Sequence, residues 1–486
     1  MKQLLRKLIK GLAYSGAALV IVLAIAVGIF RLMLPRLPEY QEEIKGWASE
    51  AIGMDVKFTG MNARWRLSGP ELSFFDASLQ HRDTGISVAN AEEVSIGVGL
   101  WRLVVDREVV VERVTIRESA IDLRQDGNGN WILQGIPLDE LIGDREFAAQ
   151  PGGNIRLIGQ NLAVKYEHPA SGQLVPFTVS NVIVSGTDAG LGIDASIDLD
   201  REFGEHLNIQ ADRPVGGDAQ DSWRLYVEAE SLDLPGWSRL QQFALPNITS
   251  GTADFVLWVD LVAGAVTSAT ANVVVAELHA EAEAAMPPIG FQGSFEYSTE
   301  IDGWLLGASQ LRVDTINGDW PQSSLRLRIQ TDGDGAIQGL RGGASYFDLS
   351  DLRYIRAWLP EDHRATLDEL GLSGVMHDLS FDLGELDGDR PAFNVSAELE
   401  GAGFAPAEDR PGLREFSGRV RADRDGGRVE FDATNLQIDL GDTLPAPLTL
   451  DDAFPDLMRD RTFEVALLEF RNLVAHLIIP MYCRNR

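Results

Sequence analysis

The segment "GIDASIDLD", residues 192–200, contains the pattern that decides the fold of this chain. Every odd position from Ile193 to Leu199 is apolar, and every even position from Asp194 to Asp200 is polar. Successive side chains of a β-strand point to opposite faces, so this alternation predicts a strand with one buried and one wet face. The same period of two recurs at residues 94–98, 223–227, 325–329, 393–399 and 436–440. The sequence therefore predicts a mainly β protein.

Short turn signals separate the predicted strands. Asp-Gly, Asn-Gly and Gly-Gly pairs suit the positive φ angles of tight hairpins, and they occur at residues 126–129, 317–318, 332–335, 387–388 and 426–427. Apolar residues at steps of three and four predict short helices over 37–52, 349–359 and 367–370. Together these signals predict an elongated, curled antiparallel β-sheet, an open groove with a few short helices. Either a second sheet covers its apolar face and closes a sandwich, or acyl chains cover it in an open groove.

The N-terminal region contains one long apolar run, from Gly11 to Phe30, which four cations precede. A run of this length matches the roughly 20 residues that cross a bilayer as a helix, and the cations favour a cytoplasmic N-terminus. We predict a single-pass inner-membrane protein with its bulk in the periplasm. A signal peptide cleaved after Ala26 is the alternative. The residues that represent the predicted anchor are Leu12, Ala18, Val22, Ile25 and Phe30.

The charge of the chain argues against one class of partner. With 42 basic and 73 acidic residues the net charge is −31, whereas nucleic-acid binding needs clustered Lys and Arg. We therefore expect no nucleic-acid partner. The single cysteine, Cys483, leaves no internal disulfide.

No residue pattern in the sequence points to catalysis, so we expect no enzyme activity, no cofactor and no metal. The seven histidines are scattered, and neither a Gly-x-Ser-x-Gly elbow nor a phosphate-binding loop occurs. Acidic turns at 126–130 and 332–335 offer oxygen ligands to calcium, but they lack the 12-residue spacing with a closing Glu. Hairpin turns select the same residues for backbone reasons.

Residues 30–79 and 89–133 resemble the start of AsmA-like envelope proteins of the YhdP type. The closest correspondences are Gly53–Val56, Trp65–Leu72 and the turn Asp126–Trp131. The resemblance implies a periplasmic β groove, anchored in the inner membrane and related to TamB and other bridge-like lipid transfer proteins. It divides the chain into a tail and anchor (1–35), an AsmA-like module (36–150), a repetitive β-groove region (151–440) and an atypical tail (441–486). We interpret that tail, which loses the strand alternation, as a sign of a truncated or frame-shifted product.

The resemblance and the alternation together predict a function. We expect the groove to shield acyl chains of phospholipid during transport between inner and outer membrane. The alternative is an assembly factor that pairs its exposed strand edges with outer-membrane or other periplasmic partner proteins. The candidate groove-lining residues are Val94, Ile96, Val114, Ile116, Ile193, Ile197, Leu325, Leu327, Val395 and Leu399.

Overall fold

The fold is known from a computed structural model. Apart from Tyr14 and Gly28, it describes residues 41–450, except 53–54, 67–68, 81, 83–84, 86, 100–109, 127–129, 138–154, 170–171, 173, 188–189, 215–221, 241–246, 281–286, 334, 360, 385–391, 408–410, 425, 433–434 and 440–446. The predicted anchor residues Leu12, Ala18, Val22, Ile25 and Phe30 and the tail from 451 onward lie outside the described residues. None of the helices that the structure describes has the length and apolar character needed to cross a bilayer.

The chain divides into two compact units. Unit 1 comprises Met1–Asp200 and Asn208–Gln220, and unit 2 comprises Arg201–Leu207 and Asp221–Arg486. The domain boundaries predicted from the sequence stay predictions. We describe each unit by itself.

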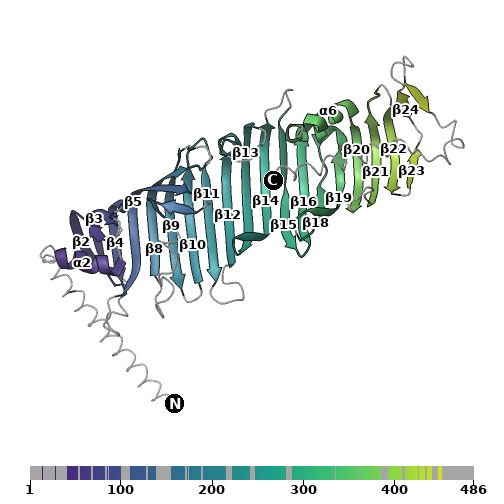
Figure 1. The fold of residues 1–486 in the computed structure, drawn as a ribbon. Coiled ribbons are helices and arrows are strands. Elements are labelled where there is room, and N and C mark those ends of the chain that lie inside the picture. The colour runs from purple at the N-terminus through teal and green to yellow at the C-terminus, as the bar shows by residue number, and fades with distance from the viewer. Residues whose placement is uncertain are drawn as a thin grey trace, which may run out of the picture. The chain divides into compact units, whose positions relative to one another are not determined.

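In unit 1, a helix that starts at Gln41 leads into a sheet (Figure 1). Within the described residues, neighbouring strands among β1 to β10 pair antiparallel, but β5 and β8 run parallel with Arg113 opposite Arg156. The expectation of a wholly antiparallel sheet was therefore wrong at this place. The elements are α2 (Gln41–Ile52), β1 (Asp55–Lys57), β2 (Gly60–Arg66), β3 (Gly69–Gln80), β4 (Ser87–Val98), β5 (Val111–Gln125), β6 (Trp131–Leu133), β7 (Ile136–Pro137), β8 (Ile155–Glu167), β9 (Leu174–Thr187), β10 (Gly190–Leu199) and, apart from its first two residues, β11 (His206–Pro214).

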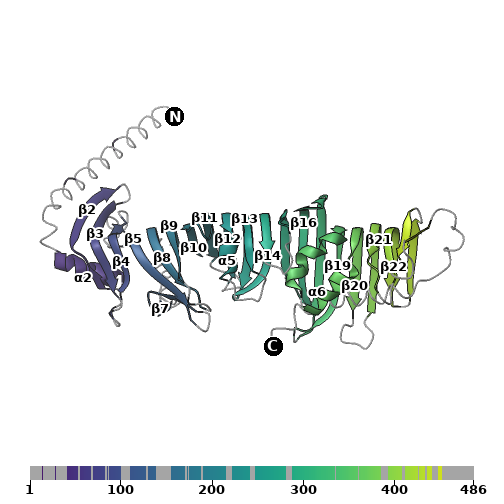
Figure 2. The same cartoon turned by 90° about the horizontal axis from the view of Figure 1, so that it is seen from above.

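Unit 2 is built from a run of antiparallel strands that pair mostly with their neighbours in sequence. Figure 2 shows these strands as a single layer. The strands are β12 (Ser222–Asp233), β13 (Ile248–Val262), β14 (Ala265–Ala280), β15 (Ile289–Glu300), β16 (Gly303–Thr315), β17 (Gly318–Asp319), β18 (Ser323–Thr331), β19 (Ile337–Asp348), β20 (Ser373–Gly384), β21 (Ala392–Phe404), β22 (Gly412–Asp423), β23 (Gly426–Asp432), β24 (Leu436–Asp439) and β25 (Leu448–Leu450).

Short helices interrupt this run of strands. The predicted helix after residue 349 is a 3-10 helix, η2 (Leu349–Trp358), and α6 (Glu361–Leu370) follows it. The two are joined by a salt bridge of 2.7 Å between Arg356 and Asp368. The sequence did not predict α5 (Leu234–Ser238), a short helix that the Asp233 side chain caps by accepting a hydrogen bond from Gly236 N.

A row of bulged residues bends the strands of unit 2. Five exposed polar residues on alternating long strands have φ between 49° and 59°. Each lies where the pairing register with a neighbouring strand shifts. Because a β-bulge increases the local twist and bend of its strand, repeated bulges curl a sheet. These residues are Ser231, Glu277, Gln310, Asp378 and Glu415.

Gly303, at the start of β16, provides a test of how closely the backbones of β16 and β18 approach each other. Its φ is +147°, and a Cβ atom added there would clash with the Ile329 carbonyl oxygen of β18. We expect Gly303→Ala to lower the free energy of unfolding of unit 2 by about 2 kcal/mol or more, through backbone strain and steric clash. Urea unfolding measures this loss. In the control Gly333→Ala, the added Cβ meets no atom within 4 Å, and an equal loss there would contradict the account.

Candidate functional site

The largest surface that the alternation creates is the apolar face of unit 2. Cross-strand pairing places apolar residues next to one another on this face. Val273 of β14, for example, lies between Phe255 of β13 and Gly293 of β15. Leu306 of β16 likewise lies between Tyr297 and Leu327. The apolar face of unit 2 is formed by Trp223, Leu225, Val227, Phe255, Leu257, Val259, Val273, Phe291, Phe295, Tyr297, Trp304, Leu306, Leu325, Leu327, Ile329, Leu340, Phe381, Leu383, Phe393, Val395 and Leu399.

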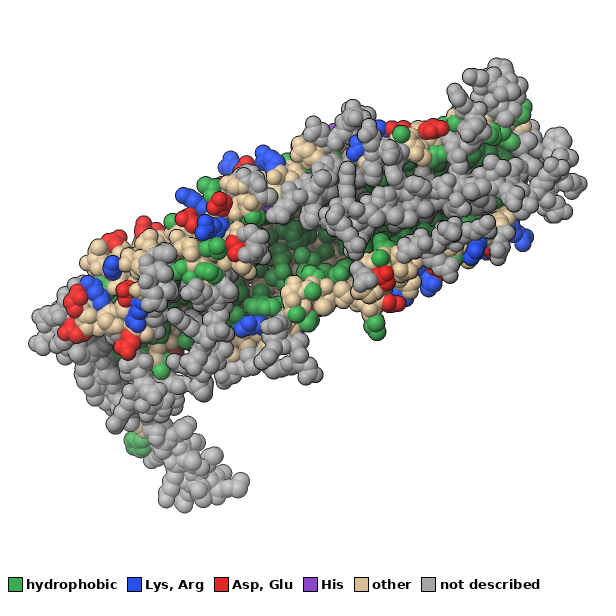
Figure 3. Space-filling view, viewed as in Figure 1, with side chains coloured by type: hydrophobic (Ala, Val, Ile, Leu, Met, Phe, Trp, Pro, Cys, Tyr) green, Lys and Arg blue, Asp and Glu red, His purple; other side chains and the backbone are tan. Residues whose placement is uncertain are grey.

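This face is only partly covered. Most of its side chains are half-buried, and Leu306 is 38% exposed. Figure 3 shows hydrophobic side chains gathered in a hollow over β12 to β14, with charged side chains along its rims. Among the described residues, unit 2 has no second sheet layer that would close the face into a sandwich. An extended apolar surface of this kind usually marks a binding site, because water contact with it is unfavourable.

The structure places the predicted lining residues on the apolar faces of their units. In unit 2, Leu325 and Leu327 share β18, and β19 and β20 separate them from Val395 and Leu399 on β21. In unit 1, two cross-strand pairs lie side by side, Val94 with Ile116 and Ile96 with Val114. Ile193 and Ile197 share β10 and are half-buried. Lipid contact at any of these positions stays a prediction.

Two of the predicted lining residues lie in a sealed core. Val94 and Ile96 are 0% exposed and belong to a cluster with Phe74, against which Ile44 of α2 packs. The Ser49 side chain of α2 accepts a hydrogen bond of 3.0 Å from Val56 N, which holds the helix at the first strand. A charge introduced at Ile96 would therefore mainly report on core stability. The partly exposed side chains of unit 2 offer a cleaner test of ligand contact.

The opposite face of unit 2 is polar. Arg326 and Arg328 alternate with the lining leucines and form ion pairs with Glu296 and Glu300, respectively. A shallow hollow of about 1010 Å³ on this face is lined mainly by carboxylates, amides and hydroxyls. The Asp254 carboxylate in it accepts a hydrogen bond of 2.7 Å from the bulged Ser231 N. This hollow therefore suits water and polar groups, in contrast to the apolar face.

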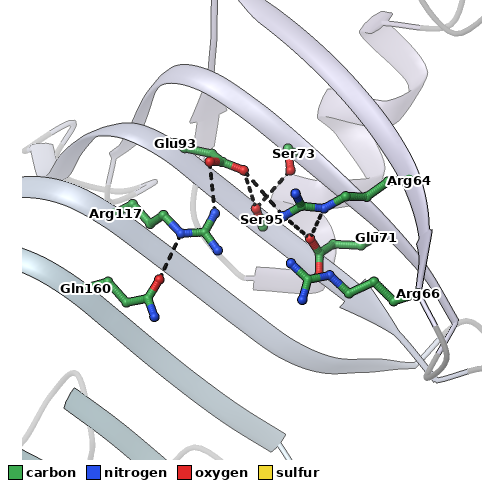
Figure 4. A network of polar contacts seen from close by, with 8 residues as sticks. All are labelled: Arg64, Arg66, Glu71, Ser73, Glu93, Ser95, Arg117 and Gln160. Carbon is green, nitrogen blue, oxygen red and sulfur yellow. Dashed lines mark hydrogen bonds and ion pairs between the residues drawn. The ribbon is translucent and has the colours of Figure 1, made fainter. Parts of the chain in front are cut away.

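The polar face of unit 1 contains a network of charged side chains (Figure 4). Arg64 and Arg66 of β2 both bind the Glu71 carboxylate, whose side chain is 4% exposed. Arg66 Nε lies 2.7 Å from Glu71 Oε2. On the next strands, Glu93 binds Arg117 at 2.9 Å, and Arg117 donates to the Gln160 amide oxygen at 2.9 Å. The network thus connects strands β2, β3, β4, β5 and β8.

Hydrogen bonding lowers the pKa of Glu93. Burial alone raises the pKa of this carboxyl group, but hydrogen bonds from Ser73, Ser95 and Arg117, together with the Arg117 charge, outweigh that effect. The group therefore releases its proton at lower pH in the folded state than in the unfolded state. Its contribution to stability is fully present above the unfolded pKa of about 4.3 and is lost as the pH falls through the folded value.

We expect Glu93→Gln to weaken the pH dependence of unit 1 stability. The wild type should lose stability between pH 5 and pH 3 partly through Glu93, while the variant should be less stable at pH 7 and change less over this range. Urea titrations at pH 7, 5 and 3 measure the difference. Glu398→Gln is the control, because its pair with Arg419 is half-exposed and contributes little. Identical pH profiles for wild type and Glu93→Gln would contradict the assigned role.

The two acidic turns have structural roles. The Asp126 carboxylate accepts hydrogen bonds from the backbone N and the side-chain amide of Asn130 at 2.8 and 3.1 Å. Asp332 Oδ1 likewise accepts from Ala336 N at 2.8 Å. Among the described residues, no group of three or more His, Cys, Asp or Glu side chains could hold a metal ion.

The fold and these faces define a class: a single-layer β-sheet protein whose units each carry one apolar and one polar face. The family model of the YhdP protein matches residues 1–458, and the chain belongs to this family. One relative is the intermembrane phospholipid transporter YhdP of Escherichia coli (strain K12), which is 22% identical over 465 residues. The match covers 92% of this chain and 36% of the relative. The chain thus spans about a third of the length of that relative.

Proposed function

We propose that this chain binds phospholipid through its apolar faces and takes part in phospholipid transport between the inner and outer membrane. The half-buried apolar face of unit 2 is the observation that carries the proposal. Acyl chains are the complementary ligand, since each methylene removed from water contributes about 0.8 kcal/mol. The family relationship and the name of the relative support the same assignment. The proposed function involves no chemical step.

The apolar face and its polar rims suit the two parts of a phospholipid, the acyl chains and the head group. Acyl chains would lie against side chains such as Phe295 and Leu327, and the head groups would remain in water at the rims of the sheet. The free energy of binding to a row of similar apolar side chains is nearly the same at each position. A lipid could therefore move along the face with little change in free energy. We further propose that the apolar run Gly11–Phe30 anchors the chain in the inner membrane with the bulk in the periplasm, as its length and flanking cations predict.

Native mass spectrometry of the full chain, purified in mild detergent, tests the proposal. We expect mass increments equal to phospholipids, which lipid extraction and fragmentation would identify. A stable protein client without any lipid would instead support the assembly-factor alternative. A chain that retains neither after purification from lipid-replete membranes would contradict lipid binding.

A further inference from the structure

A second binding site is indicated by a recess on the polar face of unit 1, on the other side of the sheet from the apolar face. The recess has a volume of about 210 Å³. This is below the roughly 300–1,000 Å³ of sites for drug-sized ligands, so it suits a small group. Its lining residues are Arg66, Glu71, Arg113, Thr115, Arg117, Arg156, Ile158 and Gln160.

Two arginines in this recess lack an acidic partner. Arg66 and Arg117 are neutralised by Glu71 and Glu93 in the network described above. Arg113 and Arg156 form no ion pair or hydrogen bond through their side chains within the described residues. They are direct register partners on the parallel strands β5 and β8, a placement that is unfavourable for like charges. Five arginines, counting Arg64, thus surround two glutamates in a chain whose net charge is −31.

The strands on either side place small, uncharged residues next to this pair. The register partner of Arg113 on β4 is Gly97, where an added Cβ would meet the Arg113 Cβ at 3.4 Å. The register partner of Arg156 on β9 is the small, neutral Ser185. Thr115 follows Arg113 on the same face, is 5% exposed, and makes no side-chain hydrogen bond within the described residues. An unpaired hydroxyl and two unpaired guanidinium groups therefore meet at one recess.

We propose that Arg113, Arg156 and Thr115 bind a phosphate group. Guanidinium groups match phosphate oxygens with paired N–H donors, and the hydroxyl supplies a further donor. The bound anion would relieve the repulsion between the two arginines. The group could belong to a phospholipid head group or to free phosphate, which share this chemistry. The proposal does not depend on lipid binding at the apolar faces.

Isothermal titration of the full chain in mild detergent, at constant ionic strength in chloride, tests the site with two probes: inorganic phosphate and a short-chain phosphatidic acid. We expect the double variant Arg113→Gln/Arg156→Gln to weaken binding of the preferred probe about tenfold or more. The matched control is Arg326→Gln/Arg328→Gln, which removes the same charge from the polar face of unit 2. It should bind as the wild type does. Tighter binding of the lipid probe assigns the site to a head group, and equal or tighter binding of inorganic phosphate assigns it to the free anion.

The thermal unfolding midpoint shows whether a loss of phosphate binding comes from a loss of folding. Without ligand, removal of two repelling charges should leave the thermal unfolding midpoint of the double variant unchanged or raised. Added phosphate should raise the midpoint of the wild type and the control, but not that of the double variant. Equal affinity in wild type and double variant, no binding of either probe to the wild type, or a marked loss of midpoint in the ligand-free double variant would each overturn the proposal. The variant Val273→Glu, on the apolar face of unit 2, should leave phosphate binding intact, so the two proposals can fail separately.

Discussion

Val273→Glu is expected to reduce the phospholipid retained by the purified chain by more than tenfold. Val273 faces Phe255 on the neighbouring strand within the apolar face of unit 2. A carboxyl group there would lose its hydration against acyl chains without gaining a partner, whether it stays ionised or takes up a proton, and this costs several kcal/mol. Native mass spectrometry, with the bound lipid quantified per chain, measures the effect.

Val274→Glu is the matched control on the same strand. Val274 lies on the polar face of unit 2, where its register partner is Asp254. The Val274 side chain is 46% exposed. The same change of side chain one residue away should therefore leave the bound lipid within about twofold of the wild type. Thermal unfolding midpoints of both variants show whether the sheet is intact. Equal lipid loss in two folded variants would show that binding does not depend on the apolar face.

The second large effect is expected at the predicted membrane anchor. Replacement of Val22 and Ile25 by Asp should release the chain from the carbonate-resistant membrane fraction, because each charge near the centre of a span costs about 2.5 to 3.5 kcal/mol on insertion scales. Fractionation after alkaline carbonate measures the distribution. Replacement of the same two residues by Leu is the control and should stay in the membrane. Recovery of the wild type in the soluble fraction with a new N-terminus at Val27 would instead identify a cleaved signal peptide.

Much of the fold could be predicted because strand alternation is a local property. The segment at 192–199 lies within β10, and the segment at 325–329 lies within β18, with the predicted apolar side chains on one face. The parallel pairing of β5 with β8 could not be predicted, because alternation does not encode the direction of the neighbouring strand. The bulges leave only a weak signal, such as the slip in alternation between Ala229 and Leu232.

The candidate sites, too, depend on contacts that local alternation does not encode. The alternation of apolar and polar residues correctly predicted that the lining residues lie on the apolar faces. It could not show that Ile96 is buried in a core against which α2 packs. Coverage depends on contacts between elements that are distant in sequence. The arginine recess was missed for a related reason. Its two unpaired members, Arg113 and Arg156, come together only because β5 and β8 are parallel neighbours.

Site-specific photocrosslinking in cells tests the central claim most directly. A photoreactive residue at Leu327 lies on the apolar face of unit 2, and one at Arg326 lies on the opposite face of the same strand. We predict that the probe at Leu327 captures phospholipid and that the probe at Arg326 captures at most a tenth as much. Equal capture at both positions, or no lipid at Leu327 in a folded chain with lipid present, would contradict the account.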